Sequence, residues 1–62
     1  MDFIETVLVS GYGRCFLVSR SVVLSDLDYQ YESTEDCITC DERYDIYSNE
    51  DGDYFAVKEG EQ

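Results

Sequence analysis

Residues 43–58 read RYDIYSNEDGDYFAVK and contain the clearest structural signal in the chain. Polar and apolar residues alternate in the first part of this stretch, which places Tyr44 and Ile46 on one face of a predicted strand. Residues 49–52, Asn-Glu-Asp-Gly, are a strong turn signal, and residues 53–58 supply the returning strand. The stretch therefore predicts a β-hairpin.

A second hairpin is predicted near the start of the chain. Residues 3–9 are mostly apolar and rich in Val and Ile, which favours a strand. The glycines of residues 11–13 favour a turn, because glycine reaches positive φ without steric conflict, and residues 15–18 resume the strand. Residues 22–24, Val-Val-Leu, either extend this strand or begin another one after a bend at residues 19–21.

Between the two hairpins, residues 27–32 alternate with a period of two and predict a half-buried strand. The side chains expected to face inward are Leu27, Tyr29 and Tyr31, and those expected to face outward are Asp28, Gln30 and Glu32. A helix that begins at Ser25 as its N-cap is the alternative.

The segment after this strand carries a helix-start signal. Residues 33–36, Ser-Thr-Glu-Asp, offer an N-cap followed by acids, so a short helical segment is predicted at residues 35–42. Residues 59–62 are predicted to be a frayed tail. Together these patterns predict a mainly β protein with one domain over residues 1–62. We expect an antiparallel sheet of about five short strands, either open or curled into a small open barrel.

Charge divides the chain into two parts. Fifteen Asp and Glu oppose four Lys and Arg, for a net charge of −11. Residues 1–25 sum to zero and are apolar, so the whole net charge lies in residues 26–62. Such a balance excludes direct binding to nucleic acid or to an anionic membrane as the main activity, because phosphate binding needs clustered Lys and Arg.

Catalysis is not expected. The chain has no His, and none of its serines has a base in the sequence to activate it. Residues 49–53 look like a calcium loop, but the alignment places Tyr47 and Lys58 at the positions that need oxygen ligands. No cofactor is implied, and an enzyme is not predicted.

Three cysteines cannot form a fully paired disulfide framework. Cys37 and Cys40 have metal-ligand spacing, with Cys15 elsewhere, but a structural zinc site needs four ligands and the chain has no imidazole. A metal-binding module built on these three cysteines is therefore a minor alternative. Because Met1 is followed by acids and no basic segment leads into an apolar run, we expect a cytoplasmic protein with reduced thiols and no membrane span.

The acidic surface is the main functional feature. A small domain stays soluble with a net charge of about 2–8, so −11 exceeds that need and destabilises the fold through self-repulsion. Outward carboxylates with tyrosines beside them suit a basic partner. The residues predicted to bind the partner are Asp28, Glu32, Glu35, Asp36, Asp41, Glu42, Asp45, Glu50, Asp51, Asp53, Tyr29 and Tyr31.

The size, acidity and aromatic content are shared with nucleic-acid-mimicking inhibitors, which bacteriophages and mobile elements often make, although no motif matches a named family. The sequence thus predicts an inhibitor that occupies the basic nucleic-acid site of a partner protein, in the host cytoplasm if the chain is viral. The alternative is an acidic accessory protein that binds a basic partner without blocking nucleic acid. A homodimer through the apolar first 25 residues is also open.

Overall fold

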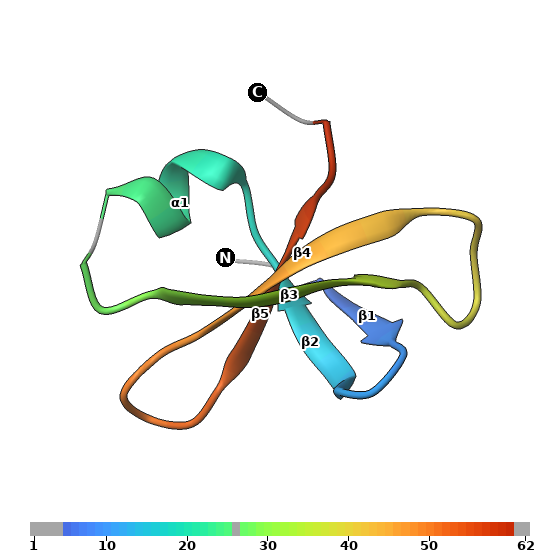
Figure 1. Ribbon diagram of the computed structural model, residues 1–62, viewed down its shortest axis with the longest axis horizontal. Helices are drawn as coiled ribbons and strands as arrows, with labels where there is room; N and C mark the ends of the chain where they lie inside the picture. Colours follow the sequence, from blue (N-terminus) through green and yellow to red (C-terminus); the bar gives the residue numbers. More distant parts are fainter. Residues whose placement is uncertain (1–4, 26, 61–62) are drawn as a thin grey trace.

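The computed structural model describes residues 5–25 and 27–60. It contains a five-stranded sheet and one short helix (Figure 1). The elements in chain order are β1 (Thr6–Val9), β2 (Gly13–Leu17), α1 (Arg20–Leu24), β3 (Gln30–Asp36), β4 (Arg43–Ser48) and β5 (Tyr54–Lys58). The mainly β fold predicted from the sequence is confirmed. The predicted strand residues Phe3 and Ile4 lie outside the described residues.

The strand order is β1-β2-β5-β4-β3, and the sheet is mixed. Both predicted hairpins form: β1 pairs antiparallel with β2, and β4 pairs antiparallel with β5. However, β2 pairs with β5 in parallel, with Phe16 opposite Phe55. A wholly antiparallel sheet was therefore the wrong prediction. Parallel pairing arises because α1 and the β3–β4 hairpin intervene between β2 and β5, and the chain returns to β2 by a crossover.

The two edge strands approach each other at one end of the sheet. Val9 of β1 bridges Cys37, just after β3. The Ser10 N–H donates to the Asp36 carbonyl at 3.0 Å, and the Ile38 N–H donates to the Leu8 carbonyl at 2.8 Å. The sheet is thus strongly curled, and its two edges are hydrogen-bonded to each other at this end, but it does not close into a barrel.

The main core lies on one face of the sheet. Its buried members are Val9, Cys15, Cys37, Tyr44, Ile46 and Ala56. Tyr44 and Ile46 share this face, as the alternation in β4 predicted. The opposite face, which we call the α1 face, carries Asp45 and its neighbour Val57, and Arg20 of α1 contacts Asp45 on this face. Val23 of α1 and Val57 of β5 are both buried.

One strand prediction and one helix prediction were wrong. Residues 22–24, predicted as strand, belong to α1, although Val is a poor helix former. Burial of Val23 and the Arg20–Asp45 contact stabilise the helix instead of propensity. Residues 35–42, predicted as helix, continue β3 through Asp36 and then turn towards β4. Pairing of β3 with β4 satisfies the backbone there, so the N-cap signal is not used.

The inward orientation predicted for residues 27–32 holds for Tyr29, which is half-buried, but was wrong for Leu27 and Tyr31. Leu27 is 98% exposed because it precedes β3, which begins only at Gln30, and Tyr31 is 56% exposed. A register shift between Tyr31 and Ser33 then changes the phase of the strand. As a result Tyr31 and Thr34, three residues apart, share the α1 face opposite Tyr47 and Asp45.

The end of the chain is partly anchored. The Glu59 N–H donates to the Arg43 carbonyl at 3.0 Å, so Glu59 continues the pairing with β4 and is not frayed. Residues 61–62 of the predicted tail lie outside the described residues.

Candidate acidic interaction surface

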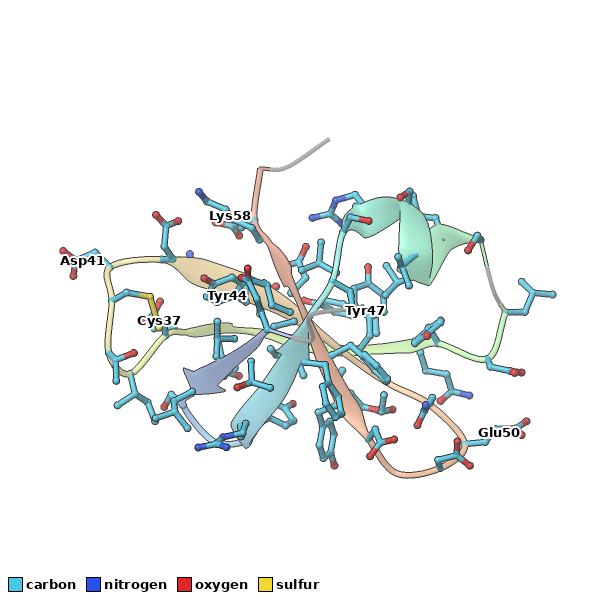
Figure 2. The ribbon with its side chains drawn as sticks, turned by 180° about the vertical axis from the view of Figure 1, so that it is seen from behind. Cys37, Asp41, Tyr44, Tyr47, Glu50 and Lys58 are labelled. Atoms are coloured by element: carbon cyan, nitrogen blue, oxygen red, sulfur yellow. A yellow bond between two sulfur atoms is a disulfide. The ribbon has the colours of Figure 1, made fainter. Side chains whose placement is uncertain are left out.

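The loops at the two ends of β4 carry acidic residues to opposite ends of the molecule. Figure 2 labels Asp41 in the loop between β3 and β4 and Glu50 in the turn between β4 and β5, far apart at opposite ends of the molecule. We call the first group the disulfide end; it comprises Asp36, Asp41 and Glu42. We call the second the turn end; it comprises Glu32, Glu50, Asp51 and Asp53, with Tyr31 and Tyr54.

The acids of the disulfide end are accompanied by cations. Asp36 Oδ1 lies 3.3 Å from Arg43 Nε, and Glu42 Oε2 lies 3.7 Å from Lys58 Nζ. All four side chains are between 46% and 76% exposed, so these pairs are solvent-screened and contribute little to stability. Their main effect is to offset negative charge locally.

The acids of the turn end have no such compensation. In residues 5–25 and 27–60, no ion pair reaches Glu50, Asp51 or Asp53. The turn itself is well fixed, because Asn49 Oδ1 accepts hydrogen bonds from the N–H groups of Asp51 at 3.1 Å and Asp53 at 3.0 Å. Gly52 takes a φ of 84°, which only glycine adopts readily. The carboxylates therefore project from a rigid turn.

Glu32 extends the turn end across β4 to β3. Its Oε2 accepts a hydrogen bond from Ser48 Oγ at 2.6 Å, and Ser48 directly precedes the turn. Ser48 also pairs with Tyr54 at the start of β5. Glu32 of β3 and Tyr54 of β5 thus lie on either side of Ser48 on the core face, whereas Tyr31 lies on the α1 face.

Asp45 differs from the other predicted partner-binding acids because its carboxylate makes hydrogen bonds that connect α1, β3 and β4. Asp45 Oδ2 accepts from Arg20 Nη2 at 2.9 Å, and Asp45 Oδ1 accepts from Thr34 Oγ1 at 2.7 Å. Partial burial alone would raise the pKa of Asp45, but the hydrogen bonds from Thr34 and Arg20 outweigh it and leave the pKa below its ordinary value. With 17% of its side chain exposed, Asp45 links α1 to two strands.

Two tyrosine hydroxyls extend hydrogen-bonded chains to carboxylates. Thr34 uses its hydroxyl hydrogen on Asp45, so Tyr31 must donate to Thr34 Oγ1, at 2.7 Å. On the core face, Ser33 donates to Glu35 at 2.9 Å, so Tyr12 donates to Ser33 Oγ at 2.7 Å. Glu35 is half-buried, and the hydrogen bond from Ser33 holds its carboxylate beside its own strand.

The aromatic side chains form contacts that continue across strands. Tyr31 meets Tyr47 edge to face at 5.6 Å between ring centroids, and Tyr12 meets Tyr54 at 5.0 Å. Tyr29 is half-buried and packs edge to face on Phe55 at 5.0 Å. Of the two tyrosines predicted to bind a partner, Tyr31 presents much of its ring to solvent, whereas Tyr29 contributes to packing.

Some features of this surface were missed by the sequence reading. Tyr54, which is 38% exposed, was assigned only to a strand. Its place close to the turn signal, at the second position of the predicted returning strand, is the sequence signal for an exposed tyrosine. A shallow hollow lined by Phe16, Val18, Asp53 and Phe55 could not have been found, because it depends on the parallel pairing of β2 with β5. Asp28 lies just before β3 and is exposed.

The prediction that all three cysteines are reduced thiols was wrong. Cys37 and Cys40 form a disulfide within the loop between β3 and β4. Cys15 is free and fully buried in the core, and burial raises the pKa of its thiol. No cluster of potential metal ligands occurs in the described part of the chain. The minor zinc alternative thus loses two of its three thiolates to a covalent bond.

Comparisons with known protein families, with curated proteins and with solved structures found no match to this chain. In residues 5–25 and 27–60, no helix has the length and apolar character that crossing a bilayer requires.

Proposed function

We propose that this protein is a small, non-catalytic acidic inhibitor that docks in the basic nucleic-acid-binding site of a partner protein. Its action is competitive exclusion, because each Lys or Arg that it neutralises is unavailable to phosphate. The observation that supports this most is the distribution of ion pairs. The disulfide end and Asp45 use Arg20, Arg43 and Lys58, whereas the turn end presents Glu50, Asp51 and Asp53 without an ion pair among the described residues.

The charge density of the protein is comparable with that of a nucleic acid. The longest dimension of the fold is 28 Å, and a DNA duplex of that length carries about 16 charges. A net charge of −11 over the same distance is roughly two-thirds of that density. A groove that binds a duplex through Lys and Arg would therefore attract this protein strongly at low salt.

The turn end also offers the features that anchor protein interfaces. Tyr31 is 56% exposed and Tyr54 is 38% exposed, and each is supported by a neighbouring tyrosine ring. Tyrosines held in this way lose little side-chain entropy on binding. The hollow lined by Phe16, Val18 and Phe55 can receive the aliphatic part of a Lys or Arg while Asp53 pairs with its charge.

The test compares two double substitutions that change the net charge equally. Glu50→Gln with Asp51→Asn alters the turn end, and Asp36→Asn with Glu42→Gln alters the disulfide end. A partner captured from lysate and eluted with a salt gradient is then titrated with each variant in competition with labelled DNA or RNA. We expect the turn-end variant to bind more weakly by about 1–3 kcal/mol, and the disulfide-end variant by less than about 1 kcal/mol.

Two outcomes would contradict the proposal. Equal losses for both variants would mean that only net charge matters and that the turn end is not a docking surface. Binding of a partner that leaves its nucleic-acid affinity unchanged would favour an accessory protein instead. A cytoplasmic location and a viral or mobile-element origin stay predictions. The location is tested by alkylation of cysteines during rapid lysis, which measures whether Cys37 and Cys40 are paired in the cell.

A further inference from the structure

The outer edge of β3 is not covered by another strand over most of its length. β3 is the outermost strand of the sheet and runs for seven residues, Gln30–Asp36. On the side away from β4, the backbone of β3 makes one hydrogen bond within the described residues, from the Ser10 N–H to the Asp36 carbonyl. Successive residues of a strand point their N–H and C=O groups to alternate sides, so residues two apart point to the same side. The N–H and C=O of Thr34, two residues before Asp36, therefore also point away from β4. Residues 30–35, about 20 Å of strand, therefore present an open edge.

The charges beside this edge are of one sign. Residues 28–36 contain Asp28, Glu32, Glu35 and Asp36, and no Lys or Arg. Glu32 and Glu35 lie towards the core face, since Glu32 contacts Ser48 and Glu35 pairs with Tyr44. Asp36 lies on the α1 face, where it contacts Arg43. A strand added to this edge would thus have carboxylates beside both of its faces.

We propose that the open edge of β3 binds an extended, arginine- or lysine-rich segment of a basic protein as a sixth strand. This inference rests on the proposed function and names the form of the partner. Backbone hydrogen bonds to residues 30–35 would supply affinity, and basic side chains at alternate positions would meet Glu32 and Glu35. The exposed ring of Tyr31 at the start of β3 suits the stacking of an arginine side chain.

Charge also argues against the other occupant of a free edge, a second copy of this chain. Two β3 strands side by side would bring four acids of residues 28–36 against four more. Like charges directly opposite one another destabilise a sheet, and charged residues on an edge are a common protection against self-pairing. The same carboxylates that discourage a dimer favour a basic strand.

The test uses the whole protein and two synthetic peptides of equal length and charge. The first peptide repeats Arg-Thr four times and can form a strand. The second repeats Arg-Pro four times; its prolines lack an N–H and favour the polyproline II conformation. We expect the first peptide to bind at least about tenfold more tightly, because the second cannot form the full set of backbone hydrogen bonds.

The site is located by NMR and hydrogen exchange. Saturation with the Arg-Thr peptide should shift the amide signals of residues 30–35. At a peptide concentration of 100 times its Kd, exchange of the Thr34 amide should slow by about a hundredfold. Glu32→Gln with Glu35→Gln should weaken binding of this peptide more than Glu50→Gln with Asp51→Asn, which removes the same charge elsewhere.

Each alternative outcome overturns the inference in a recognisable way. Equal binding of both peptides, or shifts confined to residues 49–53, would show attraction by charge alone and would leave the proposed function standing. No binding of either peptide at low salt would overturn the edge inference and count against the proposed function as well. Concentration-dependent dimers in ultracentrifugation, with Thr34 protected in the absence of peptide, would assign the edge to self-association.

Discussion

Replacing Asp45 with asparagine is expected to loosen the attachment of α1 to the sheet. The carboxylate accepts from Arg20 at 2.9 Å and from Thr34 at 2.7 Å, and asparagine keeps one acceptor oxygen but loses the charge. Hydrogen bonds to charged groups stabilise by about 1.5–3 kcal/mol, and partial exposure of Arg20 and Asp45 reduces this. We therefore expect a loss of about 1–2 kcal/mol, which lowers the Tm of a domain this small by roughly 8–15 °C.

A double-mutant cycle isolates the ion pair from other effects. Asp45→Asn and Arg20→Gln, alone and together, should give a coupling energy of about 1–2 kcal/mol at pH 7 in urea unfolding. The matched control is the exposed pair of Asp36 and Arg43, 3.3 Å apart, whose coupling should stay below about 0.5 kcal/mol.

The pH dependence of this coupling has a definite sign. The pKa of Asp45 is lowered in the folded protein, so its stabilisation is present above the pKa of the unfolded chain, about 3.9. It is lost as the pH falls through the lower pKa of the folded state. A coupling energy below about 0.3 kcal/mol at pH 7, or one that persists undiminished near pH 2, would refute the reasoning.

Three further predictions concern the whole fold. Because the acids repel one another, Tm should rise between about 10 and 300 mM sodium chloride as the Debye length shortens; a flat or falling Tm would show that the acids are not crowded. Cys40→Ser should lower the free energy of unfolding by about 2 kcal/mol and make Tm insensitive to dithiothreitol, since the disulfide closes a loop of four residues. Leu27→Ser should change stability by less than about 0.5 kcal/mol in urea unfolding, because Leu27 is 98% exposed; a larger loss would restore the inward orientation predicted from the alternation.

The two hairpins could be predicted because their signals are local. The glycines of residues 11–13 and the Asn-Glu-Asp-Gly turn of residues 49–52 define reversals of the chain that need no other contact. Tyr44 and Ile46 were placed correctly, since β4 lies inside the sheet and its alternation is not interrupted.

The errors occur where distant contacts override local preference. Val22 and Val23 favour a strand, but burial of Val23 and the contact of Arg20 with Asp45 hold them in a helix. Alternation alone could not reveal the extra residue at the register shift of β3, which moves Tyr31 to the α1 face.

The same limit applies to the candidate site. Composition indicates an acidic surface, but the sequence cannot tell that Asp45 is held by Arg20 and Thr34 while Glu50 and Asp51 have no ion pair in the described residues. The pairing of cations with particular acids depends on the strand order, which arises only when the whole sheet has formed.

The parallel pairing of β2 with β5 has a consequence for the order of folding. Each hairpin joins residues close in sequence, and such turns form in about 1–10 μs. Phe16 and Phe55, in contrast, must meet across most of the chain. The entropy lost in closing this large loop precedes any gain from the contact, so we expect the joining of β2 to β5 to limit the folding rate. Until it occurs, the apolar inner face of the β4–β5 hairpin is not covered by β2.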